Sequence, residues 1–187
     1  RRDFSIQPPG TTLLDVLADA GIPRSGVGKV DDLFAGRSIS SRHTADNAEG
    51  IAALLEWLSG PAHGFCFANL VDFGQLYGHR NDVRGFQGAL EAFDRALPSL
   101  LAALRENDLL FITADHGNDP TTPSTDHARE RVPLLVASDV EPGLGRLEGG
   151  AFVTASYSAG SATVLPSNMA MGAAASDSLA AEMGRIT

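Results

Sequence analysis

Basic residues, cysteine and long apolar runs are all scarce in this sequence, and each shortage excludes a class of protein. Lysine and arginine together number 14, against 23 aspartate and glutamate residues, so the formal net charge is −9. Nucleic-acid binding requires a basic face, so this balance disfavours a nucleic-acid partner. A small phosphorylated substrate is not disfavoured, because bound divalent cations can reverse the local sign of the charge.

The lone cysteine and the short apolar runs indicate a cytoplasmic protein without membrane contact. Cys66 has no second cysteine with which to form an internal disulfide, and its apolar neighbours predict a buried thiol in a reducing compartment. No apolar run approaches the roughly 20 residues that a helix needs to span a bilayer. The oligomeric state is left open.

Length and composition fit one globular domain. The 187 residues are 43% hydrophobic and 20% charged, which is close to the average for soluble globular proteins. The first residues, Arg1-Arg2-Asp3-Phe4, contain neither an initiator methionine nor an apolar signal region. We therefore expect the chain to be a piece of a longer protein.

The spacing of apolar residues predicts alternating helices and strands. Thr11 or Thr12 can cap a first helix that Gly21 ends, and Pro98 is expected to kink or restart a later one. The expected helices span 11–21, 44–58, 84–105 and 173–183, and the expected strands span 22–27, 64–71, 108–114, 131–137 and 151–157. This order predicts an α/β fold, with a mostly parallel sheet and helices on both faces.

Two polar loops, 72–82 and 115–130, directly follow expected strands. In parallel sheets the functional loops lie beyond the carboxyl ends of the strands. Three histidines fall in these loops, namely His79, His116 beside Asp115, and His127. Imidazole and carboxylate ligands suit Mn²⁺, Zn²⁺ and Fe²⁺, so the loops predict a metal site, while a purely structural role in turns is an equal alternative from spacing alone.

The other polar residues of interest have simpler expected roles. We expect His43 and His63 at surface turns, Asp31, Asp32 and Asp46 as helix caps or solvated charges, and Asn118, Asp119 and Asp126 as groups that support the loop.

Lys29 is the only lysine and lies between Gly28 and Val30. Its compact cation suits a phosphate or a sugar hydroxyl, although an ordinary surface lysine is the alternative. No phosphate-binding P-loop motif and no G-x-S-x-G nucleophile motif is present, so nucleotide binding of that kind and a serine hydrolase have no support.

Taken together, these motifs resemble phosphopentomutases of the alkaline phosphatase superfamily, over about residues 1–137. The matching blocks are Thr113-Ala114-Asp115-His116-Gly117-Asn118-Asp119, Thr125-Asp126-His127, Arg131-Val132-Pro133-Leu134-Leu135, Asn69-Leu70-Val71-Asp72-Phe73, Tyr77-Gly78-His79-Arg80, Gly28-Lys29-Val30 with Phe34-Ala35-Gly36, and Arg2-Asp3-Phe4 through Pro9. The metal loop is the most specific block, because its length, its ligands and the strand after it all match.

The resemblance implies an isomerase of nucleoside catabolism that interconverts the 1-phosphate and the 5-phosphate of ribose or deoxyribose. Such enzymes use two Mn²⁺ ions and a phosphorylated threonine. The resemblance implies that Asp115 and His116 bind one ion, that His79 and His127 bind the other, and that Lys29 contacts the pentose phosphate substrate.

The sequence departs from the family pattern in three places. The family has Asp-Phe-Asp after Val71, and its second aspartate is a metal ligand. Gly74 stands at that position here, which should weaken the second metal and leaves Asp72 as a candidate substitute. The segment with the phosphorylated threonine has no match, so we assign no catalytic residue and expect this piece alone to be inactive. The tail after about residue 140 does not resemble the family ending.

The resemblance also predicts the domain organisation. Residues 1–10 are expected to be a linker that returns from a missing cap domain, and residues 11–187 to be the metal-binding core, with 140–187 as a divergent tail. Only the C-terminal half of the alkaline phosphatase-like core is expected in this chain.

Two further functions remain open. One is another member of the same superfamily, either a metal-dependent phosphohydrolase or a cofactor-independent phosphoglycerate mutase. The short spacing from Val71 to His79 and the block around Lys29 argue against it. The other is a degenerate remnant without catalysis that binds at most one metal weakly, and Gly74 favours that hypothesis.

Overall fold

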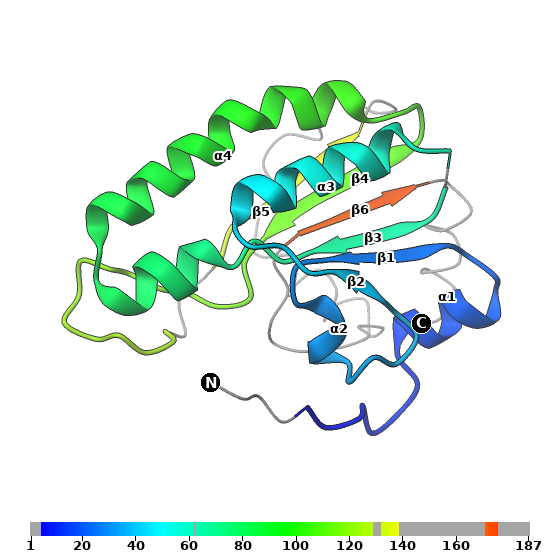
Figure 1. The fold of residues 1–187 in the computed structure, drawn as a ribbon, viewed down its shortest axis with the longest axis horizontal. Helices are drawn as coiled ribbons and strands as arrows, with labels where there is room; N and C mark the ends of the chain where they lie inside the picture. Colours follow the sequence, from blue (N-terminus) through cyan, green and yellow to red (C-terminus); the bar gives the residue numbers. More distant parts are fainter. Residues whose placement is uncertain (1–4, 62, 129–131, 139–170, 176–187) are drawn as a thin grey trace.

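Helices and strands alternate along most of the described chain (Figure 1). The computed structural model describes residues 5–61, 63–128, 132–138 and 171–175. The helical segments are α1 (Leu13–Asp19), α2 (Val30–Leu33), α3 (Asn47–Ser59), the π-helical turn η1 (Phe73–Tyr77), the 3-10 turn η2 (Gly78–Arg80) and α4 (Val83–Ala103). The strands are β1 (Arg24–Val27), β2 (Ser41–Arg42), β3 (Phe65–Ala68), β4 (Asp108–Thr113), β5 (Leu134–Ser138) and β6 (Met171–Ala175).

The six strands form one sheet in the order β2-β1-β3-β6-β4-β5. Strand β1 pairs in parallel with both β2 and β3. Strand β6 pairs antiparallel with β3 and with β4, so β3 and β4 run in the same direction. The carboxyl ends of β1, β3 and β4 therefore meet at one edge of the sheet, as the α/β fold predicted.

Two hydrophobic clusters cover opposite faces of β3, all four residues of which are buried. Phe65 and Phe67 pack with residues of α1 and α2. Cys66 and Ala68 pack with residues of α3, α4 and β4. Because successive side chains of a strand point to opposite faces, this split places helices on both sides of the sheet. Burial raises the pKa of the Cys66 thiol to about 12, as expected for an unreactive core cysteine.

Helices α1, α3 and α4 each begin after a residue whose side chain caps the first turn. Thr12 accepts a hydrogen bond from the backbone N–H of Asp15, whose carboxylate accepts one from the N–H of Thr12, so α1 begins with a capping box. Asp46 caps α3 by accepting from the backbone N–H of Glu49, and Asp82 caps α4 by accepting from that of Gly85, without the reciprocal bond. The cap predicted at Thr11 or Thr12 is thus confirmed at Thr12, and Asp46 is confirmed as a helix cap.

One expectation for the middle of the chain was wrong, and a second was wrong in part. The segment after β3 was predicted to be a loop, yet it forms η1 and η2 in succession. Pro98 does not restart the helix, because α4 continues through it, and the kink expected there stays a prediction. Pro98 and Asp94, whose carbonyl would accept from residue 98 in a regular helix, are both exposed residues.

The second half of the sheet departs from an all-parallel arrangement. Strand β5 pairs antiparallel with β4, because the described part of the connection between them contains no crossover helix. The helix expected at 173–183 is wrong at its start, since 171–175 is strand β6 and fills the gap between β3 and β4. The remainder of that helix and the strand expected at 151–157 lie outside the described residues.

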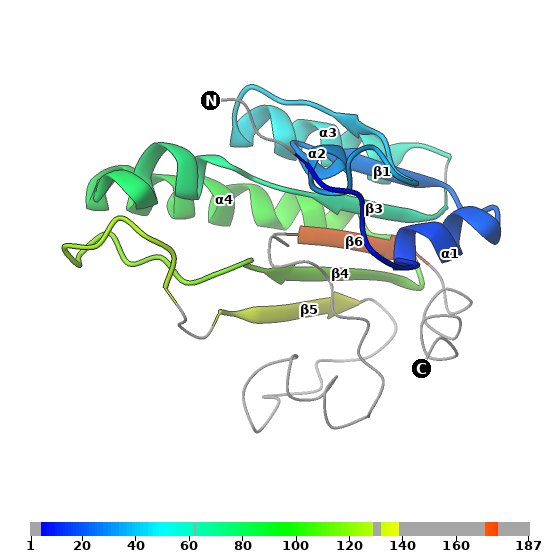
Figure 2. The same ribbon diagram turned by 90° about the horizontal axis from the view of Figure 1, so that it is seen from below.

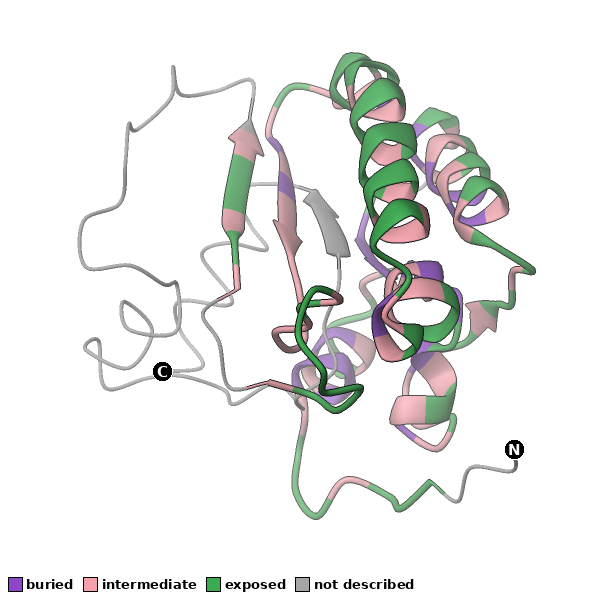
Figure 3. Cartoon of the chain, turned by 90° about the vertical axis from the view of Figure 1, so that its left-hand side faces the viewer, coloured by how far each residue is buried: buried purple, intermediate pink, exposed green. Residues whose placement is uncertain are grey.

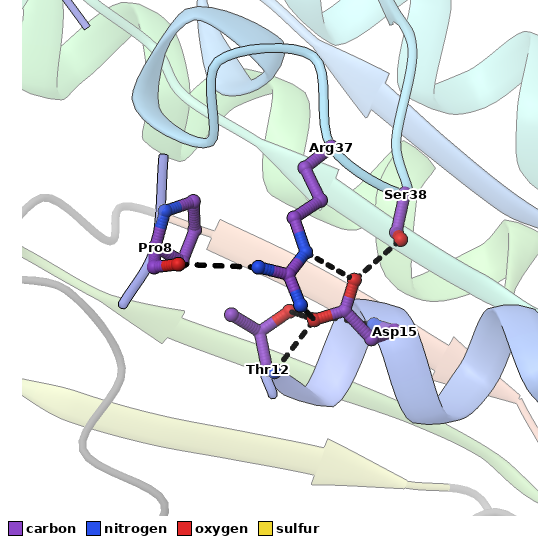
Figure 4. Close-up of polar contacts among 5 residues, drawn as sticks. All are labelled: Pro8, Thr12, Asp15, Arg37 and Ser38. Atoms are coloured by element: carbon purple, nitrogen blue, oxygen red, sulfur yellow. Dashed lines mark hydrogen bonds and ion pairs between the residues drawn. The ribbon is translucent and has the colours of Figure 1, made fainter. Parts of the chain in front are cut away.

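A buried carboxylate ties the segment before α1 to the loop after α2 (Figure 4). Arg37 Nε donates to Asp15 Oδ1 at 2.9 Å, and Ser38 Oγ donates to the same oxygen at 2.6 Å. Arg37 Nη1 donates to the carbonyl of Pro8 at 3.1 Å. Burial alone would raise the pKa of Asp15, but the hydrogen bonds from Ser38, Thr12 and Arg37 together hold that pKa well below its usual range.

No helix among the described residues is both long enough and apolar enough to cross a membrane.

Candidate metal centre

Two segments that follow parallel-running strands meet at one edge of the sheet. The chain leaves β3 through η1 and η2, which end in His79 and Arg80, and leaves β4 through the loop that contains His116 and His127. Figures 1 and 2 show these segments side by side at the end of α4 where that helix begins. Figure 3 shows the tip of the loop after β4 as exposed.

Backbone hydrogen bonds fold the loop after β4 back on itself. Gly117 N–H donates to the carbonyl of Ala128 at 3.2 Å, and Ala128 N–H donates to the carbonyl of Gly117 at 2.9 Å. These two bonds form an isolated antiparallel bridge. The bridge brings His127 next to His116, although eleven positions separate them in the sequence.

The three loop histidines form one cluster. The ring centroids lie 3.9 Å apart for His116 and His127, 4.9 Å for His79 and His127, and 5.8 Å for His79 and His116. One ligand nitrogen from each ring lies within 4.8 Å of the other two. Three imidazoles this close can hold one ion between them after small movements of the side chains.

Backbone carbonyls fix which ring nitrogen is free to bind a metal. His79 Nδ1 lies 2.7 Å from the carbonyl oxygen of Thr125, and His116 Nδ1 lies 3.0 Å from that of Gly117. A carbonyl oxygen only accepts, so in the neutral ring each Nδ1 carries the hydrogen and each Nε2 keeps its lone pair. At His79 the 2.7 Å contact with the carbonyl is shorter than the 3.3 Å approach of the Asn118 amide nitrogen to the same Nδ1. Metal-binding histidines are commonly oriented in this way by a partner on the second nitrogen.

The direction of the His127 pKa shift also suits a metal ligand. Burial lowers the pKa of His127, and the neighbouring His116 and His79 lower it further, while Asp115 and Asp126 act in the opposite direction. Because only the neutral imidazole binds a metal, a lowered pKa keeps His127 competent at lower pH.

Asp115 lies at the margin of the cluster. Its Oδ1 accepts a hydrogen bond from the backbone N–H of His116 at 3.0 Å, and its Oδ2 lies 3.5 Å from His116 Nε2. One carboxylate oxygen is therefore available on the His116 side, as expected if the two residues share an ion.

Asp72, the other metal candidate, does not belong to the group of three imidazoles, and Lys29, the substrate candidate, follows β1. Asp72 is buried, and its Oδ2 accepts a hydrogen bond from the backbone N–H of Asn47 at 2.8 Å. Asn47 Oδ1 accepts in turn from Asp72 N–H at 3.0 Å, a pairing that the sequence analysis did not foresee. Lys29 is exposed two residues beyond the carboxyl end of β1, at the same sheet edge as the loops.

The residues expected to support the loop or to lie at the surface do not all behave as predicted. The Asn118 side-chain amide lies 3.3 Å from His79 Nδ1, and Asp119 accepts hydrogen bonds from Thr121 within the loop, which also lower the Asp119 pKa. Asp126 is exposed at the tip of the loop. His43 and His63 are exposed, as expected. Asp31 is not simply solvated, since it pairs with His43 Nε2 at 2.8 Å, with Asp32 close by.

Two glycines shape the cluster, and only one of them was noted from the sequence. A Cβ at Gly78 would lie 2.6 Å from Asn118 Oδ1 and 2.9 Å from the carbonyl oxygen of Phe73, so no side chain fits there. A Cβ at Gly74 would lie 3.5 Å from His79 Nε2, which is an ordinary contact. The backbone at Gly74 therefore faces the metal-binding nitrogen of His79 and has room for a side chain.

Comparison with known proteins places the chain in a family. Residues 14–160 match the model of the metalloenzyme superfamily. The chain is 56% identical over 139 residues to a phosphopentomutase of Caldanaerobacter subterraneus, covering 74% of this chain and 35% of that protein. It is 56% identical over 146 residues to a phosphopentomutase of Anaeromyxobacter sp. strain K, covering 78% of this chain and 37% of the relative. It is 55% identical over 137 residues to a phosphopentomutase of Thermotoga maritima, covering 72% and 35% respectively.

These similarities confirm the resemblance to phosphopentomutases that the motifs indicated. The chain spans little more than a third of the length of these curated relatives, 35% to 37% in the first two. Because the superfamily model covers most of the sequence, from residue 14 to residue 160, this chain belongs to the metalloenzyme superfamily.

Proposed function

We propose that this chain is the metal-binding part of a phosphopentomutase, which interconverts the 1-phosphate and the 5-phosphate of ribose or deoxyribose. The observation that carries the proposal is the convergence of His79, His116 and His127 from two separate loops, with one ligand nitrogen of each ring within 4.8 Å of the other two. The relatives that are 53% to 56% identical are named phosphopentomutases, which supports this substrate class over the other members of the superfamily.

The ligands fit divalent metal ions, and the family resemblance implies two ions, of Mn²⁺. His79 and His127 would hold one ion, and Asp115 with His116 would hold the other. When bound, such ions polarise the phosphoryl oxygens and offset the charge that develops on them. Thr125 and Gly117 contribute backbone carbonyls that keep two of the imidazoles in the binding tautomer.

Lys29 would contact the substrate. It projects from the same sheet edge as the histidine loops, and its exposed ammonium group can reach a phosphate or a ribose hydroxyl. No residue of this sequence matches the phosphorylated threonine of the family. The chemical step would therefore need residues from a longer parent protein, and residues 1–187 alone would not convert substrate.

The domain organisation and the compartment are part of the same proposal. Residues 1–10 would link the core to a cap domain, and residues 11–187 would form the core, in a cytoplasmic protein. The hydrogen bond from Arg37 to the carbonyl of Pro8 supports this division, since it fixes the linker where it enters the core.

A degenerate remnant is the second candidate, because Gly74 offers no carboxylate to the cluster. Titration calorimetry of the chain with Mn²⁺ separates the two functions. The metal-centre proposal predicts binding that falls by at least about tenfold in His116→Ala and in His127→Ala. The control His63→Ala changes an exposed histidine outside the cluster and should bind as the unchanged chain does.

An activity assay completes the test. The longer parent protein should convert ribose 1-phosphate to ribose 5-phosphate when divalent metal is present, and lose most of that rate with His127→Ala. Metal binding that is equal in all the variants, together with an inactive parent protein, would support the remnant. Conversion by residues 1–187 alone would contradict the assignment of the nucleophile to another segment.

A further inference from the structure

The imidazole cluster is poor in oxygen ligands. Among the residues that the structure describes, no aspartate or glutamate joins His79, His116 and His127 within the 4.8 Å that relates their ligand atoms. The carboxylate of Asp115 lies beside His116, with Oδ2 at 3.5 Å from His116 Nε2. On the His79 side, the part of the chain that the structure describes therefore adds no carboxylate to the group of imidazole nitrogens.

Gly74 lies beside His79 and has no side chain that could bind a metal. A Cβ placed there would lie 3.5 Å from His79 Nε2 and 3.6 Å from its Cδ2. The φ angle of Gly74 is outside the left-handed region, so an L-amino acid fits the backbone. A side chain one or two atoms longer than alanine would reach the position of an ion bound to that nitrogen. Gly74 is thus the position where a further ligand could be added or withheld.

Ligand type decides which ion such a cluster prefers. Imidazole nitrogen suits borderline ions such as Zn²⁺, whereas carboxylate oxygen raises the relative affinity for harder ions such as Mn²⁺. In both His79 and His116, Nδ1 faces a backbone carbonyl, and among the described residues no carboxylate joins the three-histidine group.

We propose that the His79–His127 side of the cluster is a zinc-selective site and that Gly74 sets its selectivity by withholding an oxygen ligand. This inference rests on the cluster being the metal centre of the proposed function, but it differs from the Mn²⁺ that the family resemblance implies. The identity of the ion on the His79 side is inferred here from the side chains of this chain.

The test measures how one substitution changes the ratio of two affinities. Most nitrogen and oxygen sites bind Zn²⁺ more tightly than Mn²⁺, so a high ratio in the unchanged chain proves little. Titrations with each metal should be made on the chain and on Gly74→Asp. The added carboxylate should raise the Mn²⁺ affinity on the order of tenfold and the Zn²⁺ affinity by less, so that the Zn²⁺/Mn²⁺ ratio falls.

Three further variants control this result. Gly74→Cys adds a soft thiolate at the same position and should raise the ratio, in the opposite direction to Gly74→Asp. Gly74→Ala adds bulk without a ligand and should leave the ratio unchanged. Gly88→Asp adds the same charge at an exposed position of α4 with no neighbouring atom within 4 Å of its Cβ, and it should also leave the ratio unchanged.

Three other outcomes would contradict the proposal. An equal fall in Gly74→Asp and Gly88→Asp would reduce the effect to general charge and overturn the proposal. A ratio that is the same in all the variants, with binding still lost in His127→Ala, would overturn zinc selectivity and leave the metal centre intact. Failure of the unchanged chain to bind either ion would overturn both this inference and the metal centre.

Discussion

The carboxylate of Asp72 already has a backbone partner in the folded chain. It accepts the N–H of Asn47 at the start of α3, while Asn47 accepts the N–H of Asp72. An oxygen held in this way, in a residue with only 9% of its surface exposed, is not free to replace the ligand that Gly74 lacks. Asp72 instead ties the start of η1 to α3, and so helps to hold His79 at the sheet edge.

Asp72→Ala should therefore reduce stability without weakening metal binding. The substitution leaves the N–H of Asn47 without its acceptor, which should cost roughly 1–3 kcal/mol of unfolding free energy. Chemical denaturation would measure the loss, and titration of the folded protein would measure the affinity.

Asn47→Ala is the matched control, because it removes the other half of the same pair. Both variants should lose stability by similar amounts and keep the same metal affinity. A loss of affinity in Asp72→Ala alone would make Asp72 a ligand after all.

At the scale of elements, polar contacts of Asp15 join helix α1 to the loop after α2. Asp15 in α1 holds Arg37 and Ser38 from the loop after α2, and Arg37 also holds Pro8. The sequence predicted α1 from its local cap and apolar spacing, but it predicted neither α2 nor this cluster. The partners lie 22 and 23 positions from Asp15, and only the folded chain brings them together.

The Asp15 cluster predicts acid-sensitive stability. Because folding lowers the pKa of Asp15, its carboxylate stabilises the fold above the ordinary carboxyl value of 3.8. That contribution is lost as the pH falls below 3.8 toward the lower pKa of the folded state. Asp15→Asn should cost roughly 1–3 kcal/mol at pH 6 and less at pH 3, as measured by urea unfolding at both values.

Asp19→Asn supplies the comparison, since Asp19 is exposed in the same helix. It should unfold like the unchanged protein at both pH values. Equal losses in Asp15→Asn at pH 3 and pH 6 would show that the carboxylate charge does not contribute.

The sheet shows which features of a strand can be predicted from the sequence and which cannot. The expected strands 64–71 and 108–114 contain β3 and β4, because continuous apolar runs mark buried strands. The direction of β5 and the pairing of β6 depend on partners distant in sequence, and no local signal encodes them. The cluster of histidines could be predicted because both loops follow parallel-running strands, whereas the close fit of Gly78 against Asn118 could not.

At the scale of the whole molecule, excess negative charge and metal binding are linked. The formal net charge of −9 implies self-repulsion in the folded state, which salt screens in general and a bound cation offsets locally. These two effects have different signatures. Screening acts on the whole surface, while a bound ion stabilises by mass action only if its site is intact.

Thermal unfolding in salt and in zinc should separate them. Sodium chloride should raise the Tm of the unchanged chain and of His116→Ala alike. Zn²⁺ at about 100 times its Kd should add roughly 2.7 kcal/mol of stability to the unchanged chain and little to His116→Ala. An equal gain from Zn²⁺ in both proteins would mean that the ion acts on the general negative surface, and the three imidazoles would then have no special role in holding it.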